Sequence, residues 1–77
     1  MSDLVTTLYL LERCDFLQLS SGEIVEVIIR EGKYNLFSIK RGLWFDEDME
    51  IHEFVKTTAN KLREEHLNIM DILKYRA

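Results

Sequence analysis

Apolar or small residues recur at helical spacing through the last two-fifths of the chain, from Asp46 to Arg76. The steps between them are three or four residues, which places them on one stripe of a helix. These positions are Ile51, Phe54, Val55, Thr58, Ala59, Leu62, Ile69, Met70 and Leu73. We therefore predict a long C-terminal helix that packs across a sheet built from the preceding residues.

The predicted helix begins at Asp46 or Asp48, since either aspartate is a suitable N-cap. Its one candidate break is at Leu67-Asn68, where the asparagine would cap a second helix. Unbroken, about 28 residues span roughly 42 Å, whereas a strand of about seven residues reaches only about 23 Å. Either the chain bends back after His66 or a second molecule covers the overhang. We expect self-association, through Leu62, His66, Ile69, Met70 and Leu73.

The first residues of the chain predict a short helix. The leucines of residues 4–11 fall at helical spacing and Ser2 is a suitable N-cap, so we predict a helix over residues 3–13. A strand is the alternative, because the β-branched and aromatic residues among positions 5–9 favour β structure.

Three stretches that favour β structure follow, at residues 16–19, 24–30 and 34–40, and residues 43–45 are a candidate last strand. Turns that contain glycine separate them. For the second hairpin we prefer a three-residue loop, which pairs Val27 with Phe37 and separates apolar from polar residues best. A two-residue loop of Glu31-Gly32, which pairs Val27 with Leu36, is the alternative. A slip of one residue between these registers inverts the faces of the strand.

These elements predict one α+β domain over residues 1–77: a short N-terminal helix, a three-stranded antiparallel β-meander and a long C-terminal helix packed on the sheet. With 47% hydrophobic and 31% charged residues, the composition is typical of a folded soluble protein. The single cysteine, Cys14, excludes an internal disulfide. The sequence shows neither a secretory signal nor an apolar run long enough to span a bilayer, so we expect a cytoplasmic protein.

Charge is distributed unevenly along the chain, whose formal net charge is −4. Residues 46–53 contain five acids and no base. The dipole of a helix stabilises carboxylates at its start, which is a sufficient structural reason for this acidic run. The run is also a candidate surface for a basic protein partner, formed by Asp46, Glu47, Asp48, Glu50 and Glu53. A Ca²⁺ site is less well supported, because the run lacks the glycine and the length of an EF-hand loop.

The histidines and the cysteine do not form a pattern that predicts catalysis or metal binding. His52-Glu53 begins an H-E-x-x-H zinc-protease pattern, but Lys56 stands where the second histidine ligand is needed. His66 lies about four helical turns away, too far to share a metal with His52 on one helix. Cys14 has no neighbouring histidine to activate its thiol. We therefore expect no enzymatic activity, no metal and no cofactor.

Basic and aromatic side chains alternate around the second hairpin, a pattern that can bind single-stranded nucleic acid by stacking and charge. This surface would consist of Arg30, Lys33, Tyr34, Lys40, Arg41 and Trp44. Phosphates repel a protein of net negative charge, so binding of single-stranded RNA is the alternative function and not the preferred one.

The segment from Phe16 to Glu23, followed by a strand and the triplet Tyr34-Asn35-Leu36, resembles the first motif of Sm-like RNA-binding proteins. The resemblance implies RNA contacts at Tyr34 and Asn35. The spacing from Gly22 to Asn35 is shorter than in that family, the second motif is missing, and a long helix replaces the last strands. We do not assign the chain to the family on this basis.

The preferred function is that of a small acidic protein-binding module, of adaptor, inhibitor or other regulatory type. We expect a homodimer formed through the C-terminal helix, and an acidic run that meets a basic surface of another protein. The helix overhang, the uneven charge and the failure of each catalytic pattern lead to this expectation.

Overall fold

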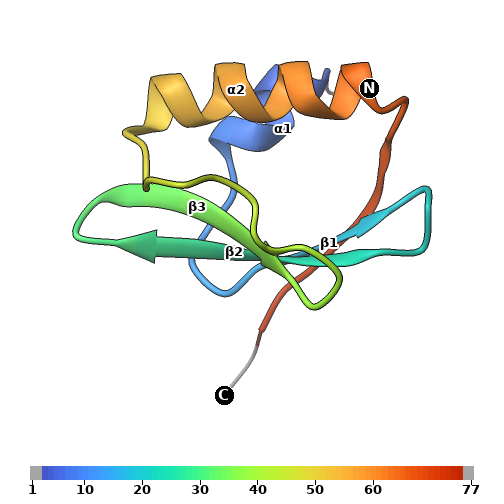
Figure 1. Cartoon of the computed structure of the whole chain (residues 1–77), viewed down its shortest axis with the longest axis horizontal. Helices are drawn as coiled ribbons and strands as arrows, with labels where there is room; N and C mark the ends of the chain where they lie inside the picture. Colours follow the sequence, from blue (N-terminus) through green and yellow to red (C-terminus); the bar gives the residue numbers. More distant parts are fainter. Residues whose placement is uncertain (1–2, 76–77) are drawn as a thin grey trace.

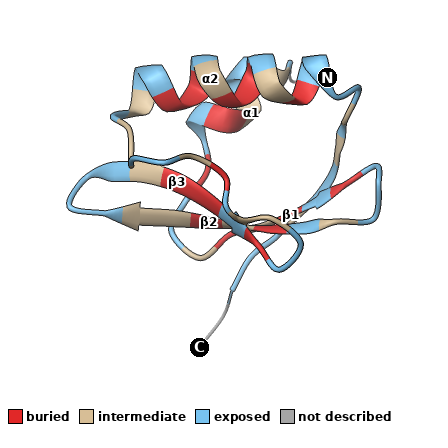
Figure 2. Cartoon of the chain, in the orientation of Figure 1, coloured by how far each residue is buried: buried red, intermediate tan, exposed pale blue. Residues whose placement is uncertain are grey.

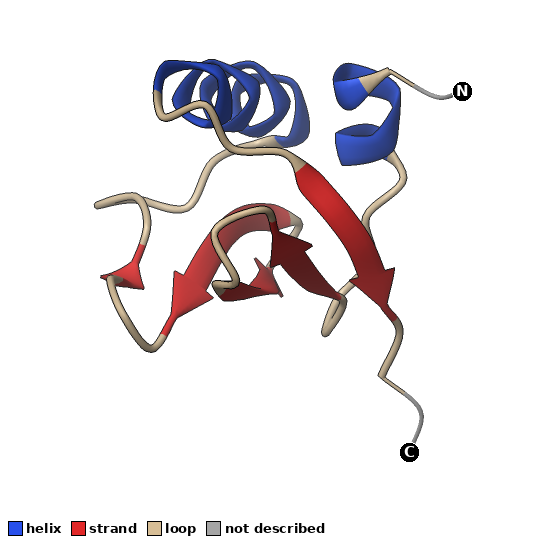
Figure 3. Cartoon of the chain, turned by 90° about the vertical axis from the view of Figure 1, so that its right-hand side faces the viewer, coloured by secondary structure: helices blue, strands red, loops and turns tan. Residues whose placement is uncertain are grey.

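The computed structural model describes residues 3–75 and contains a five-stranded antiparallel sheet with two helices over one of its faces (Figure 1, Figure 3). In chain order the elements are α1 (Leu4–Tyr9), β1 (Phe16–Leu19), β2 (Ile24–Arg30), β3 (Lys33–Ser38), β4 (Gly42–Leu43), α2 (Ile51–Glu64) and β5 (Ile69–Leu73). The strand order across the sheet is β4-β3-β2-β1-β5. The predicted α+β class is confirmed, but the sheet has more strands than the predicted three.

The short N-terminal helix is confirmed, and the alternative strand is wrong. Its N-cap is Asp3, whose carboxylate accepts a hydrogen bond of 2.8 Å from the main-chain N–H of Thr6. This bond satisfies one of the donors that a helix leaves free at its start. The predicted N-cap, Ser2, lies outside the described residues. The helix ends at Tyr9, earlier than predicted, and packs against α2.

The N-cap of α2 is Glu50, and the predicted caps at Asp46 and Asp48 are wrong. The Glu50 carboxylate accepts hydrogen bonds from the N–H groups of His52 and Glu53, at 3.0 and 2.8 Å. Asp48 has other partners, because its carboxylate binds Arg30 and Asn35. The residues before Glu50 therefore form a loop, and the helix begins only after Glu50.

The helix ends at Glu64 and does not continue to Arg76 as predicted. His66 has a positive φ of 56°, and the N–H groups of His66 and Leu67 bond back to the carbonyls of Arg63 and Leu62. Paired bonds of this kind, around a residue in the left-handed conformation, end many helices. The chain bends back after His66, as one of the two predicted alternatives requires, so the helix leaves no overhang.

The residues after this bend form β5, which pairs with β1 (Figure 1). The predicted second helix, with Asn68 as its cap, is therefore wrong. The main-chain N–H of Asn68 instead donates to the Ser20 hydroxyl, and its carbonyl accepts from the Ser20 N–H. Ile69 and Ile72 pack against the core.

The β2–β3 hairpin uses the two-residue loop, and the preferred three-residue register is wrong. Val27 pairs with Leu36, and Glu26 pairs with Phe37. Glu31 and Gly32 both have positive φ, at 53° and 76°, as a tight two-residue hairpin turn requires. The faces of β3 are consequently inverted relative to the prediction, and the side chain of Phe37 lies on the outer face. β3 and β4 also end earlier than predicted, at Ser38 and Leu43.

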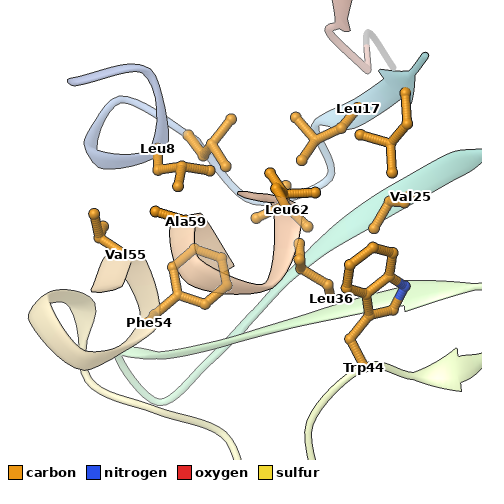
Figure 4. Packing of buried hydrophobic residues seen from close by; sticks show 12 residues of the cluster. Leu8, Leu17, Val25, Leu36, Trp44, Phe54, Val55, Ala59 and Leu62 are labelled. Carbon is orange, nitrogen blue, oxygen red and sulfur yellow. The ribbon is translucent and has the colours of Figure 1, made fainter. Parts of the chain in front are cut away.

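The core lies between the helices and the inner face of the sheet (Figure 2, Figure 4). The apolar stripe of α2 supplies one side of it, with Phe54, Val55, Ala59 and Leu62. Leu8 and Leu11 close it beside α1, and the sheet supplies Leu17, Leu19, Val25, Val27 and Leu36. The predicted stripe is thus confirmed as far as Leu62, and α2 ends two residues later, at Glu64.

Candidate protein-interaction surface

Two of the five acids in residues 46–53 are hydrogen-bonded within the fold, although four of the five line one shallow depression. The Asp48 carboxylate accepts hydrogen bonds from Arg30 at 3.0 Å and from Asn35 at 2.9 Å, which hold its pKa below the usual value. The Glu50 carboxylate caps α2, and the N–H donors of His52 and Glu53 lower its pKa in the same way. The remaining acids, Asp46, Glu47 and Glu53, are exposed and line a shallow depression of about 390 Å³.

Two residues of the predicted nucleic-acid surface, Arg41 and Trp44, form an internal polar network. The Arg41 guanidinium lies 4.1 Å from the centre of the Trp44 ring, and Trp44 is only 8% exposed. The same guanidinium binds Glu65 at 2.7 Å and Glu23 at 3.1 Å, and these hydrogen bonds raise its pKa. Ser38 accepts a hydrogen bond from the Trp44 indole and donates one to Glu23. Both groups are therefore engaged within the fold.

The other members of that predicted surface lie at opposite ends of β3: Arg30 is the register partner of Lys33, next to Tyr34, and only Lys40 lies at the far end. Arg30 pairs with Asp48, and the ring of Tyr34 packs on Phe54 with ring centres 5.2 Å apart. Lys33 begins β3, whereas Lys40 lies in the turn after β3. The structure therefore does not gather the predicted basic and aromatic residues into one surface.

Asn35, one of the two RNA contacts implied by the Sm-like resemblance, is fully buried. Its amide donates to the carbonyl of Phe45 at 3.0 Å and to the Asp48 carboxylate, and its oxygen accepts from the N–H groups of Leu36 and Phe45. All of its hydrogen-bonding capacity is used to hold the loop before α2 beside β3. The Asn35 side chain therefore has a structural role and offers no exposed group to RNA.

The residues predicted for self-association lie in different environments. Leu62 is 1% exposed and contributes to the core of its own chain, so it is not available to a second molecule. His66 forms the bend, and Ile69 is partly buried. Met70 and Leu73 lie on β5 and are 65% and 44% exposed. The predicted homodimer thus loses its basis in a helix overhang, and the structure of residues 3–75 offers no other support for it.

The strand β5 forms one edge of the sheet, beside a groove of about 620 Å³ between it and α1. An edge strand offers unpaired main-chain groups to any further strand. Within β5 the carboxylate of Asp71 accepts a hydrogen bond of 2.9 Å from the N–H of Ile72. The Asp71 side chain therefore accepts the hydrogen bond of one main-chain N–H group on this edge strand.

His52 and Cys14 both make contacts within the fold. Nδ1 of His52 lies 2.8 Å from the hydroxyl of Tyr9, which links α2 to α1, a contact that the sequence did not predict. Cys14 has a positive φ of 68°, and its N–H donates to the carbonyl of Val27. Among residues 3–75, histidine, cysteine and acidic side chains form no group of three or more that could hold a metal ion.

The outer face of the sheet carries a row of side chains that crosses all five strands. Register pairs link Leu43 of β4 to Phe37 of β3, Phe37 to Glu26 of β2, Glu26 to Phe16 of β1, and Phe16 to Leu73 of β5. We call these five residues the outer row. The helices cover the opposite face (Figure 1), and Leu43, Phe37 and Leu73 are 49%, 38% and 44% exposed.

Further apolar side chains flank the outer row. Ile24 and Ile28 precede and follow Glu26 on the same face of β2, and Ile24 is exposed. Figure 2 shows buried residues alternating with exposed and intermediate ones along the strands. Sequence reasoning missed the row because the preferred register turned Phe37 inward. The one indication of the outer row in the sequence was the alternative register with the two-residue loop, which places Phe37 on the outer face.

Comparison of the chain with protein-family models, with curated proteins and with solved structures gave no match. Within residues 3–75, none of the helices combines the length and the apolar character needed to cross a membrane. The choice of the outer row as the candidate site therefore rests on the structure of this chain alone.

Proposed function

We propose that this chain is a small protein-binding module, without enzymatic activity of its own, that binds a partner protein through the outer row. The observation that carries the proposal is the alignment of four apolar side chains, one on each of four strands, on the face that the helices leave uncovered. Exposed apolar side chains gathered on one face are characteristic of sites that bind other proteins.

The register of the hairpin supports the proposal further. A one-residue shift would have placed Phe37 on the inner face, yet the adopted pairing buries Leu36 and Ser38 there and leaves Phe37 outside. Aromatic side chains are enriched among the residues that contribute most to protein–protein binding. Phe37 and Phe16 would therefore provide the anchors of the proposed interface.

Nucleic-acid binding, the alternative function, has less support from the geometry. The indole of Trp44 is buried under Arg41, whose charge is already paired with Glu23 and Glu65. Stacking of bases would need an exposed aromatic ring beside an unpaired positive charge.

The proposal is tested with peptides selected from a random displayed library against the immobilised protein. The selected peptides are synthesised, and their affinities are measured for the wild type, for Phe37→Ser and for Met70→Ser. The Met70 variant is the matched control, because it removes an exposed apolar side chain away from the outer row. Thermal unfolding verifies that both variants are folded.

We expect Phe37→Ser to weaken peptide binding by about tenfold or more, as loss of an interface anchor does, and Met70→Ser to leave it unchanged. A library that yields no binding peptide, or peptides whose affinity is insensitive to Phe37→Ser, would contradict the proposal.

A further inference from the structure

Glu26 stands at the centre of the outer row, with apolar residues on all four sides. Phe37 and Phe16 are its register partners on β3 and β1, and Ile24 and Ile28 are its neighbours on the same face of β2. The side chain is already partly buried. Within residues 3–75 its carboxylate has neither a hydrogen bond nor an ion pair, whereas Glu12, Glu23, Glu50 and Glu65 each have at least one.

A partner that covers the outer row also covers this carboxylate. Removing an ionised carboxylate from water without a compensating group is costly, and the charge must be paired and hydrogen-bonded for the burial to be tolerated. The four apolar neighbours of Glu26 cannot supply such a group. The compensating charge therefore has to come from the partner.

We infer that the partner of this chain is a protein surface whose apolar side chains surround a single lysine or arginine, which pairs with Glu26. This inference rests on the proposed function, and it adds the chemistry by which the outer row selects what it binds. Such a charge contributes mainly to specificity, because a purely apolar partner leaves Glu26 buried and unpaired.

The same arrangement disfavours a second copy of the chain on this face. Glu26 is the middle member of the outer row, so a two-fold axis that lays one row over another places Glu26 against Glu26. Two carboxylates in one covered site repel each other. If the axis runs across the row, Leu43 faces Leu73 and Phe37 faces Phe16; if it runs along the row, each residue faces its own copy. In both cases only the Glu26 pair is incompatible.

The same symmetry allows the Glu26→Lys variant of the protein itself to serve as a model of the inferred partner surface. Its outer row is apolar around a central cation, as the inferred partner surface is. The solution mass is measured by sedimentation velocity for the wild type, for Glu26→Lys and for their equimolar mixture. We expect only the mixture to shift from the 9.2 kDa of one chain toward twice that mass, and added salt to weaken the complex.

Two controls separate this pairing from general charge attraction. Glu47→Lys makes the same change of charge in the depression before α2, away from the outer row, and its mixture with the wild type should stay monomeric. Introducing Phe37→Ser into both chains of the Glu26 mixture should abolish the complex.

A mixture of wild type and Glu26→Lys that stays monomeric would overturn the inference, as would a dimer of the wild type alone that Phe37→Ser dissociates. These failures are distinct from failure of the proposed function. Library peptides that bind in a Phe37-dependent way, but with equal affinity for the wild type and for Glu26→Gln, would refute the role of Glu26 and leave the binding face standing.

Discussion

Glu31 adopts the left-handed conformation, at φ 53°, in the turn that sets the register of β2 against β3. Asparagine and glycine take this conformation more readily than glutamate, and Asn-Gly is a preferred pair for such turns. We expect Glu31→Asn to raise the free energy of unfolding by about 0.5–1 kcal/mol. Urea unfolding measures the change. Glu31→Val, which is β-branched, should lower stability, and the opposite order would mean that the turn is formed differently.

Glu50 makes the fold sensitive to acid. The N–H groups of His52 and Glu53 donate to its carboxylate and hold its pKa below the usual 4.5. Because the folded chain then binds the proton more weakly than the unfolded chain, the stabilisation is complete above pH 4.5. It is lost as the pH falls through that value and through the lowered pKa of the folded state.

We therefore expect Glu50→Gln to lower the thermal midpoint at neutral pH, and the difference from the wild type to shrink as the pH falls below 4.5. Glu47→Gln is the control, since Glu47 caps no helix. A difference between wild type and Glu50→Gln that is constant from neutral pH down to strongly acidic pH would contradict this role.

At the scale of elements, β5 shows why one part of the fold was not predictable. Ile69 and Ile72 both pack against the core although they are three residues apart, because a bulge lies opposite Gln18 and Leu19. A step of three is helical spacing, so the bulge hides the alternation that identifies a strand. The helix also ends at Glu64 without a glycine, because His66 takes the left-handed conformation that glycine usually adopts after a helix. The strands β1 and β2 alternate regularly, and their predicted bounds are confirmed.

The edge of β5 carries a prediction of its own. The Asp71 carboxylate occupies the N–H of Ile72, and a charged side chain on an edge strand discourages pairing with another strand. We expect Asp71→Ala to associate with itself more strongly than the wild type, in a sedimentation series over protein concentration. Asp71→Asn keeps an acceptor oxygen and should behave more like the wild type. Equal association of Asp71→Ala and the wild type would show that Asp71 does not protect this edge.

At the scale of the whole molecule, the sequence was sufficient for the α+β class and for most of α2, because periodicity alone determines which residues face the core. It was insufficient for the candidate site. The outer row depends on a register in which Asn35 and Ser38 are buried and hydrogen-bonded to Phe45, Asp48, Trp44 and Glu23. Hydrogen bonds between residues so far apart in the chain leave no trace in a local pattern.

The central claim is that the uncovered face of the sheet binds a protein partner. Its most direct test is the map of amide chemical-shift changes when a selected library peptide is added to the isotopically labelled protein. We predict that the largest changes fall on the strands of the outer row, around Phe16, Glu26 and Phe37. Changes concentrated in the groove beside α1, or in the acidic depression before α2, would contradict the claim.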